Sequence, residues 1–342
     1  MSLRRIPSLA AALTLALVST ACEDEVTGPG DETVEGELTI DASDQLAFTY
    51  FAFTDGGSVV SVTSPGSSTD WDMAFRRFTV KLNGGVSGPG EVAGVNLENN
   101  AALDSAGIVD FTLDDADAAF DAVTDADIVG VTFVEDGLVE DATAYLSFGG
   151  APAANPQNAW KVQLADGEHA VVRAVDFTFG GPVSFEVRHQ PSGSALSSID
   201  TVTADVSGGP VWIDLESGAT VGPAGCNWDI SVSPGADLTL NAACSAGTFP
   251  LDASEDFSAI TAADDAPEYA GFLAGTAGAF PSSFSGPEGI FWYNVDGSMR
   301  LLPTYNVFLV RVGAAVYKVQ IVDYYSATGA SGFPTMRYEQ IQ

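Results

Sequence analysis

The stretch from residue 71 to residue 85 constrains the fold most, because apolar and polar side chains alternate through two successive runs of it. The apolar positions are Trp71, Met73, Phe75, Phe78, Val80 and Leu82. A period of two is typical of a half-buried strand, whose side chains point alternately to the core and to solvent. The period slips at Arg76-Arg77, which indicates a bulge or a turn. Two arginines make a poor tight turn, so we expect the strand to continue through a bulge.

The same pattern returns in weaker form in the second half of the chain. Residues 227–232 (NWDISV) are followed by Pro234-Gly235 and then by residues 238–241 (LTLN). Three further blocks keep the same order in both halves: residues 50–56 correspond to 212–218, 120–126 to 257–263, and 172–177 to 319–324. Chance matches rarely preserve order, so the chain is predicted to be a tandem duplication.

The rest of the sequence favours strands. Its short apolar runs end in Gly, Pro, Asp or Ser, and glycine occurs 36 times. A chain of 342 residues that is 46% hydrophobic can build the cores of two ordinary domains. Only residues 113–126 and 252–265 have a helical pattern, with acidic starts that suit a helix N-terminus. The predicted fold is therefore all-β and mostly antiparallel, with one short helix per repeat.

Two of the three cysteines are predicted to form a disulfide bond. If Gly235 centres a hairpin, Cys226 and Cys244 are equidistant from it and face each other. The same register pairs Ile230 with Leu240, and it leaves the other face polar, including Asp229 and Asn241. One register thus satisfies both the apolar pattern and the cysteine geometry. The two cysteines are interpreted as structural, not as catalytic or metal-binding groups.

The N-terminus predicts export. Two arginines precede a short apolar run, as in a signal peptide, and the run is too short for a membrane span. It ends in Ser19-Thr20-Ala21-Cys22, which resembles a bacterial lipobox with Ser in place of the usual Leu. By this resemblance residues 1–21 are a lipoprotein signal peptide and Cys22 is lipidated; the alternative is an ordinary signal peptide with an unrelated cysteine. Residues 22–37 are acidic and predict a disordered tether. An exported chain permits the disulfide bond.

The charge of the chain excludes several classes of partner. Its 46 acidic and 12 basic residues give a net charge of −34. Such a surface repels nucleic acid phosphates and anionic lipid, so neither is expected as a partner. Membrane association is expected through the lipid anchor alone, with no transmembrane helix in the mature protein. The expected partner is a small-molecule ligand or a cell-surface protein.

Residues 70–88 (DWDMAFRRFTVKLNGGVSG) resemble the signature of HmuY-like proteins. Tyr324-Tyr325, Ser331-Gly332 and residues 335–338 (TMRY) carry a weaker resemblance near the C-terminus. HmuY-like proteins are mostly-β bacterial lipoproteins of the outer membrane, and the founding members capture haem. The resemblance implies two tandem HmuY-like β domains, residues 38–195 and 196–342, the second divergent. It also implies an outer-membrane location, facing either the cell surface or the periplasm.

The resemblance implies haem as a cofactor, yet the sequence departs from the family in its ligands. The founding protein holds haem iron with two histidines, and relatives are thought to use methionines. Here His169 begins one predicted strand and His189 ends the next, and a shift of one residue decides whether their rings share a face. Met73 and Met336 are the alternative ligands, although their positions within strand patterns are typical of core residues.

Other chemistries have less support. The sequence contains no G-x-S-x-G, phosphate-binding glycine loop, CxxC pair or H-E-x-x-H. The acidic cluster at residues 114–127 lacks the glycine and closing Glu of a calcium loop and is interpreted as a solvated face. Arg76 and Arg77 could hold an acidic ligand, but an ion pair with Asp70 or Asp72 is the simpler interpretation.

We therefore expect a binding protein, not an enzyme, that captures haem or a porphyrin at the cell surface with altered or lost haem ligation. The alternative is a structural or protein-interaction module of the cell envelope without a small-molecule ligand. A hydrolase would need two carboxylates that converge in a deep cleft, and no pair is singled out by the sequence.

Overall fold

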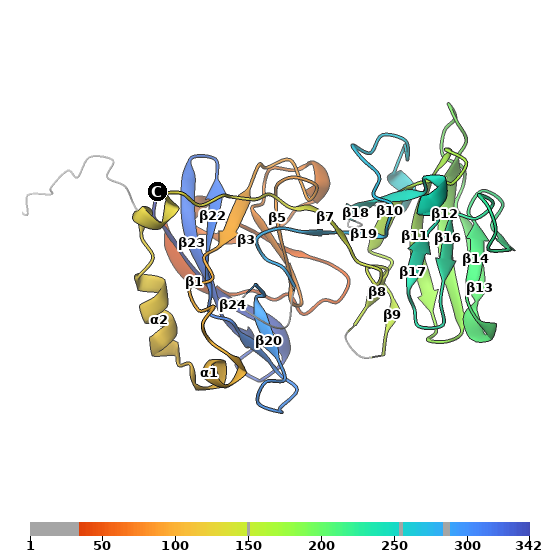
Figure 1. The fold of residues 1–342 in the computed structure, drawn as a ribbon. Helices are drawn as coiled ribbons and strands as arrows, with labels where there is room; N and C mark the ends of the chain where they lie inside the picture. The colour runs from red at the N-terminus through yellow and green to blue at the C-terminus, as the bar shows by residue number, and fades with distance from the viewer. Residues whose placement is uncertain (1–33, 149–150, 253–255, 283–287) are drawn as a thin grey trace, which may run out of the picture. The chain divides into compact units, whose positions relative to one another are not determined.

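A computed structural model describes residues 34–148, 151–252, 256–282 and 288–342 (Figure 1). Residues 33–342 form one compact unit. The predicted signal peptide, Cys22 and nearly all of the predicted tether lie outside the described residues. In the described part of the chain no helix is long and apolar enough to span a membrane.

The described residues form two lobes joined by a two-stranded connector. Lobe A comprises residues 34–136 and 278–342, and lobe B comprises residues 141–273. The connector is the antiparallel pair β7 (Gly137–Glu140) and β19 (Ala274–Ala277). Lobe B is thus inserted into lobe A, and the chain crosses between them once in each direction (Figure 1).

Each lobe packs a five-stranded antiparallel sheet against a four-stranded one. In lobe A the two sheets have the strand orders β1-β24-β23-β22-β6 and β3-β2-β4-β5. Their bounds are Glu35–Thr39, Ser331–Gln340, Ala315–Tyr325, Val307–Val312 and Ala93–Asn96 for the first, and Ser58–Val60, Thr49–Ala52, Met73–Arg76 and Thr79–Leu82 for the second. Lobe A also carries the hairpin β20 (Phe291–Tyr293) and β21 (Leu301–Pro303), and the helices α1 (Ser105–Asp110) and α2 (Leu113–Asp121).

Lobe B repeats this arrangement with the orders β13-β12-β11-β10-β18 and β15-β14-β16-β17. The bounds are Asp200–Asp205, Pro182–Gln190, His169–Phe177, Asn158–Gln163 and Gly247–Asp252 for the first sheet, and Ala219–Val221, Val211–Asp214, Ile230–Val232 and Leu238–Leu240 for the second. The short hairpin of β8 (Leu146–Ser147) and β9 (Ala153–Ala154) takes the place of β20 and β21. In both lobes the inward faces of the two sheets form the main apolar core.

The strand registers of the two predicted repeats correspond at the aligned blocks. Phe51 pairs with Met73 in β2 and β4, and Ile213 pairs with Ile230 in β14 and β16, as the aligned blocks require. The long hairpins agree as well: β11–β12 shifts register just before Asp176, and β23–β24 shifts just before Asp323. In both, the Asp side chain accepts the N–H of the next residue. The duplicated sequence therefore folds twice in the same local way.

The two repeats exchange halves between the lobes. Strand β12 of the first repeat pairs with β13 of the second, and β24 of the second repeat pairs with β1 of the first. The predicted contiguous domains 38–195 and 196–342 therefore do not coincide with the two cores. Each core combines the first half of one repeat with the second half of the other.

The hairpin of β16 and β17 has the predicted register. Ile230 pairs with Leu240, and Cys226 and Cys244 form the predicted disulfide bond, with their Cα atoms 5.5 Å apart. The expectation that Asp229 and Asn241 lie on an exposed polar face is wrong, because both side chains are buried. They are buried because they bind backbone groups, which satisfies their polar atoms away from water.

The first repeat turns where a bulged strand was expected. Arg76 pairs with Thr79, so Arg77 and Phe78 form a tight turn between β4 and β5. Arg77 takes a left-handed φ of 53°. The turn is held from outside, because the N–H of Arg77 donates to the carbonyl of Ala42 at 2.8 Å. Tertiary contacts thus override the poor turn propensity of two arginines.

The predicted helices are only partly present. Residues 113–126 contain α2, which ends at Asp121, and α1 precedes it without having been predicted. The helix expected at residues 252–265 is wrong: the described part of it holds a single 3-10 turn, Phe257–Ala259. The guanidinium of Arg188 donates to three carbonyls of this segment, those of Phe257, Ser258 and Ile260. Because these carbonyls are already bound, a helix has little to add there.

Candidate ligand-binding cleft

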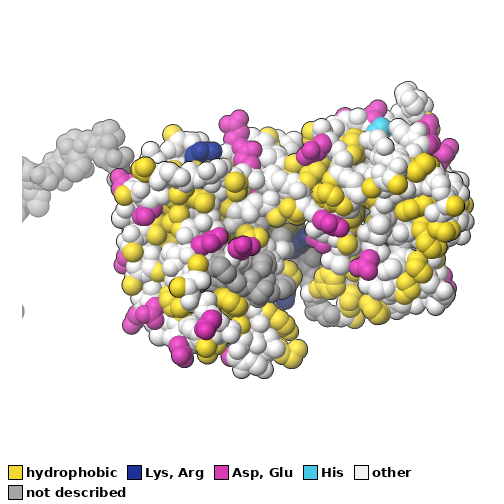
Figure 2. Space-filling view, viewed as in Figure 1, with side chains coloured by type: hydrophobic (Ala, Val, Ile, Leu, Met, Phe, Trp, Pro, Cys, Tyr) yellow, Lys and Arg dark blue, Asp and Glu magenta, His cyan; other side chains and the backbone are white. Residues whose placement is uncertain are grey.

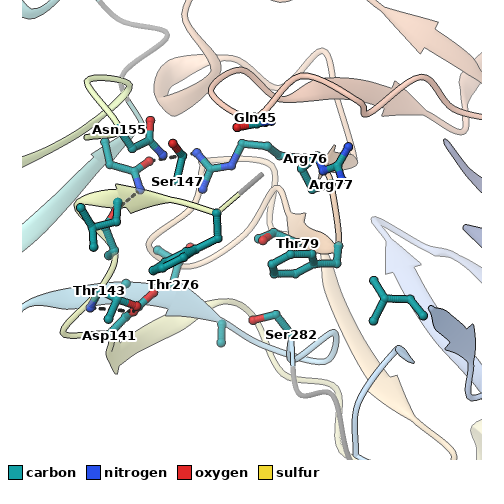
Figure 3. A pocket seen from close by; sticks show the side chains of 18 of the residues that line it. Gln45, Arg76, Arg77, Thr79, Asp141, Thr143, Ser147, Asn155, Thr276 and Ser282 are labelled. Carbon is teal, nitrogen blue, oxygen red and sulfur yellow. Dashed lines mark hydrogen bonds between the residues drawn. The ribbon is translucent and has the colours of Figure 1, made fainter. Parts of the chain in front are cut away.

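A cleft lies between the two lobes beside the connector. Its volume is about 780 Å³. Strands β7 and β19 of the connector line it, together with the β4–β5 turn and β20–β21 of lobe A and β8–β9 of lobe B. Figure 3 shows polar side chains of these elements facing a common space. Clefts of this size at the junction of two cores are typical ligand sites.

Arg76 reaches across the cleft from lobe A. Its Nη1 donates to Oδ1 of Asn158 in lobe B at 3.0 Å, and its guanidinium lies 4.4 Å from the ring centre of Phe48. The side chain extends toward Ser147 and Asn155 in Figure 3. The Asn158 amide donates to the carbonyl of Ala144, which orients its oxygen toward Arg76.

Arg77 is held within lobe A. Its Nη1 and Nη2 donate to the backbone carbonyl and the hydroxyl of Ser331, at 2.9 and 2.8 Å. Gly332, at a φ of 90°, makes this possible, because a Cβ there would lie 2.7 Å from Arg77 Nη1. The guanidinium is also 5.9 Å from the ring centre of Tyr324. These contacts to Ser331 replace the expected ion pair of Arg77 with Asp70 or Asp72.

Three exposed apolar side chains, which we call the apolar wall, line the same cleft as the arginines. Phe148, Tyr293 and Met299 line the cleft and are 50%, 46% and 72% exposed, respectively. Phe148 comes directly after β8 and Tyr293 ends β20, and these strands occupy corresponding hairpins, in which Leu146 pairs with Ala154 and Phe291 with Pro303. Large apolar side chains that meet at one exposed site indicate a contact surface for a ligand or partner.

Two buried polar atoms at the cleft have no hydrogen-bond partner among the described residues, namely Thr276 Oγ1 and Arg77 Nε. Buried polar atoms are usually satisfied, so these two atoms are left to bind water or a ligand in the cleft. Asp141 is an acidic residue of the cleft lining, and its carboxylate accepts hydrogen bonds from the N–H and the hydroxyl of Thr143. Burial raises the pKa of the Tyr324 phenol above its usual value.

Asp136 lies at the lobe A end of the connector. Its carboxylate accepts hydrogen bonds from the N–H of Leu82 at 3.1 Å and the hydroxyl of Ser87 at 2.6 Å. Burial raises the pKa of Asp136 to about 6, although these two hydrogen bonds act in the opposite direction.

The predicted histidine pair does not converge. His169 pairs with Gln190, and Ala170 pairs with His189. Because directly paired residues share a face and successive residues alternate, the two imidazoles point to opposite faces of the sheet. His169 lies against the ring of Tyr269, and Nε2 of His189 lies 2.7 Å from a carboxylate oxygen of Glu168. Neither histidine lines the cleft.

The predicted methionine pair lies in the core of lobe A. Met73 in β4 and Met336 in β24 are fully buried and belong to the same apolar cluster. Their thioethers fill the space between the two sheets, as their position in strand patterns indicated. Met299, by contrast, is exposed at the cleft.

Sequence reasoning missed most of this cleft. It noted the Arg76-Arg77 pair but assigned no role to Phe148, which follows β8, or to Tyr293 and Met299, which lie on the β20–β21 hairpin and its turn. The available signal was apolar side chains next to Gly and Asp: Phe148 precedes Gly149-Gly150, and Met299 follows a segment with Asp296-Gly297. Only the meeting of the two lobes brings these segments together.

Residues 44–187 match the HmuY protein family. This confirms the resemblance for that segment, and the match does not extend to the second repeat. No curated protein matches the chain. Several solved structures are similar at low identity. One is an apo HmuY analogue from Tannerella forsythia, with 11% identity, a TM-score of 0.35, and coverage of 90% of this chain and 96% of that one.

Two further structures come from Bacteroides. A protein from Bacteroides vulgatus that is assigned as HmuY-like and haem-binding has 12% identity and a TM-score of 0.33, and the alignment covers 90% of this chain and 91% of that one. A protein from Bacteroides fragilis that is assigned as a lipoprotein has 12% identity, a TM-score of 0.32 and the same coverage.

Proposed function

Because residues 44–187 match the HmuY family, we propose that this protein binds haem or a related porphyrin in the cleft between its lobes. The observation that carries the proposal is that the apolar wall of Phe148, Tyr293 and Met299 lines the same cleft as Arg76 and Arg77. A porphyrin has a flat apolar ring and two carboxylates at one edge. The cleft offers both kinds of partner, within the range of ordinary ligand sites.

Because the protein is strongly acidic, its few arginines are groups that can attract an anionic ligand. With a net charge of −34, the chain repels anionic ligands in general. Acidic side chains are spread over the face shown in Figure 2, where Lys and Arg are few. An anionic ligand therefore needs local cations, and Arg76 lines the cleft with a planar guanidinium that suits a carboxylate.

The residues present fit haem in their donor chemistry. Met299 carries a thioether and Tyr293 a phenol, and both groups serve as axial haem ligands in other proteins. Haem iron would supply the coordination bond, and the wall would exclude water from the ring. This assignment places the ligands on the β20–β21 hairpin and its turn, away from His169, His189, Met73 and Met336.

The proposed setting is the cell envelope. The N-terminal pattern supports export, and Cys22 is the proposed site of lipidation. An anchor of this kind would keep the cleft at the outer membrane, on the surface or facing the periplasm. Binding requires no catalytic step, and no residue is assigned one.

Titration of the purified protein with hemin tests the proposal. We expect a sharpened Soret band, weakened at least tenfold in affinity by Arg76→Ala, as expected when a charged contact of about 1.5–3 kcal/mol is lost. Met299→Ala should change the spectrum itself, because it removes an iron ligand. Arg311→Ala is the matched control, since Arg311 is exposed in lobe A and does not line the cleft.

The two histidines provide a further control. His169→Ala and His189→Ala should leave the hemin spectrum unchanged, because neither side chain lines the cleft. A spectrum that depends on either histidine would move the site to the sheet of lobe B. A featureless hemin spectrum of the wild-type protein would contradict the proposal and favour an interaction module of the envelope.

A further inference from the structure

The two lobes have separate apolar cores. Five clusters of buried apolar residues occur in the described part of the chain, and each lies wholly within one lobe. Lobes that share no core are not locked together by the hydrophobic effect, so relative motion is the default expectation. What joins them covalently is the connector of β7 and β19.

The connector has the form of a hinge. It consists of two short antiparallel strands, and each contains a glycine, Gly137 in β7 and Gly275 in β19. A Cβ on Gly137 would meet no atom within 4 Å, so the backbone there has open space around it. Hinges are short segments that absorb φ/ψ changes, often with small residues, and glycine carries the smallest steric restriction.

Both ends of the connector are fixed firmly to their lobes. At lobe A, the Asp136 carboxylate accepts hydrogen bonds from the N–H of Leu82 and the hydroxyl of Ser87. Asp136 also packs tightly against Gly278, where an added Cβ would lie 2.4 Å from Asp136 Oδ1. At lobe B, Trp160 Nε1 donates to the carbonyl of Ala274 at 2.8 Å. The two connector strands are therefore attached to a lobe at each end.

One polar contact of the described residues crosses the cleft. Arg76 of lobe A donates to Asn158 of lobe B at 3.0 Å. An amide oxygen is a neutral acceptor, and a carboxylate binds a guanidinium about twice as strongly. An anionic ligand in the cleft can therefore take Arg76 from Asn158, which couples occupancy of the cleft to the angle between the lobes.

We infer that lobe B rotates against lobe A about the β7–β19 connector, and that Arg76 exchanges Asn158 for an acidic ligand as the cleft closes. The identity of the ligand rests on the proposed function, whereas the hinge rests on the separate cores, the connector and the contact across the cleft. The expected closed state brings Phe148 of lobe B and Tyr293 of lobe A onto one ligand.

Distance measurement between spin labels tests the hinge. Val59 and Thr220 are exposed and occupy equivalent positions in β3 and β15, one in each lobe. The full chain with Val59→Cys, Thr220→Cys and Cys22→Ser offers two free thiols, because Cys226 and Cys244 are bonded to each other. Pulsed electron paramagnetic resonance then gives the distribution of distances between the two labels, with and without zinc protoporphyrin. This porphyrin is diamagnetic and therefore does not disturb the spin labels.

We expect zinc protoporphyrin to shift the mean distance by more than about 2 Å, the size that separates domain rearrangement from rigid binding. Arg76→Ala should broaden the distribution in the ligand-free protein, and Arg311→Ala should not. The dimethyl ester of the porphyrin, which lacks carboxylates, should shift the distance less than the free acid. Identical distributions in all these samples would overturn the inference.

Porphyrin absorbance, recorded on the same samples, separates the two proposals. Binding without any change in distance, in wild type and Arg76→Ala alike, refutes the hinge and leaves the proposed function standing. A broadened distribution in Arg76→Ala without porphyrin binding supports the hinge and refutes the proposed function.

Discussion

The loops that precede β4 and β16 are bound by the same two buried polar side chains, an aspartate and an asparagine, which we call the polar frame. Asp72 and Asp229 accept the N–H of Phe53 and Leu215, at 2.7 and 2.8 Å. These are equivalent positions of the two repeats, and burial raises the pKa of both aspartates. The frame thus survives duplication unchanged.

An asparagine completes the frame in each repeat. Nδ2 of Asn83 donates to the carbonyl of Trp71 at 2.7 Å, and Nδ2 of Asn241 donates to that of Trp228 at 2.9 Å. Each amide also donates to a carbonyl three residues earlier, that of Ser68 or Gly225. The two tryptophans therefore occupy equivalent places in the backbone.

The two repeats differ in what holds the loop onto this frame. Trp71 is 1% exposed, packs edge-on against Tyr50, and donates from Nε1 to the carbonyl of Pro65 at 3.0 Å. Trp228 is only partly buried, and its loop is tied by the disulfide bond of Cys226 and Cys244. One repeat uses a buried aromatic side chain and the other a covalent link, so the backbone frame sets the shape and the stabilising element is interchangeable.

The largest expected effect is a difference in stability between variants of the two tryptophans. Trp71→Ala should lower the free energy of unfolding by about 3–5 kcal/mol, because it leaves a cavity and an unpaired carbonyl. Trp228→Ala should cost much less, about 1 kcal/mol, because its side chain is partly solvated. Denaturant unfolding of the two variants measures both values, and equal losses would show that the two loops are held in the same way.

The disulfide bond gives the converse test. The double variant Cys226→Ser, Cys244→Ser should lose about 3 kcal/mol, because the bond closes a loop with a sequence separation of 18. Reduction with dithiothreitol should lower the free energy of unfolding of the wild type by the same amount. It should leave the double variant unaffected. If reduction has no effect on the wild type, the frame of Asp229 and Asn241 is sufficient by itself.

The local structure of each repeat was readable from the sequence because it depends on neighbours in the chain. The alternation of apolar and polar residues predicts which side chains face the core. A single hairpin register pairs Ile230 with Leu240 and also brings Cys226 next to Cys244. The burial of Asp229 could not be predicted in this way, because its carboxylate accepts the N–H of Leu215, directly after β14, and the N–H of Ala165 of the other repeat.

The exchange of halves could not be predicted for a different reason. Because the repeats resemble each other, the edge of β12 fits β13 of the second repeat as β24 fits β1 of the first. Strand patterns specify the pairing surfaces but not which copy supplies them. The exchange places Arg76 and Asn158 of one repeat in different lobes, so their contact across the cleft could not be predicted although Arg76 was noted.

Asp136 sharpens the comparison, because the second repeat has no carboxylate in its place. Val134 bridges Gly94 and Ala270 bridges Thr248, so Phe272 is the counterpart of Asp136. Burial raises the pKa of Asp136 from 3.8 to about 6, so the folded protein binds this proton more tightly than the unfolded chain does. This contribution to stability is greatest at low pH and is lost as the pH rises through about 6.

Asp136→Asn removes that dependence and keeps an acceptor for Leu82 and Ser87. Relative to the wild type, the variant should gain about 2 kcal/mol in free energy of unfolding between about pH 4.5 and about pH 7. Urea unfolding at a series of pH values measures the difference, with Asp104→Asn as the exposed control. A difference that does not change with pH would mean that Asp136 has an ordinary pKa.

The smallest effect tests whether the two bulges are equivalent in energy as well as in register. Asp176 and Asp323 each cap the N–H of the next residue, at 2.9 and 2.6 Å, at the same step of the long hairpin. Either Asp→Ala change should cost about 1 kcal/mol, because a carboxylate cap at a partly solvated site is worth that much. Asp323 also accepts the N–H of Tyr325, so Asp323→Ala should cost slightly more than Asp176→Ala. Thermal unfolding resolves the pair, and the reverse order would show that the bulge of lobe A is held by its neighbour Tyr324 and not by its cap.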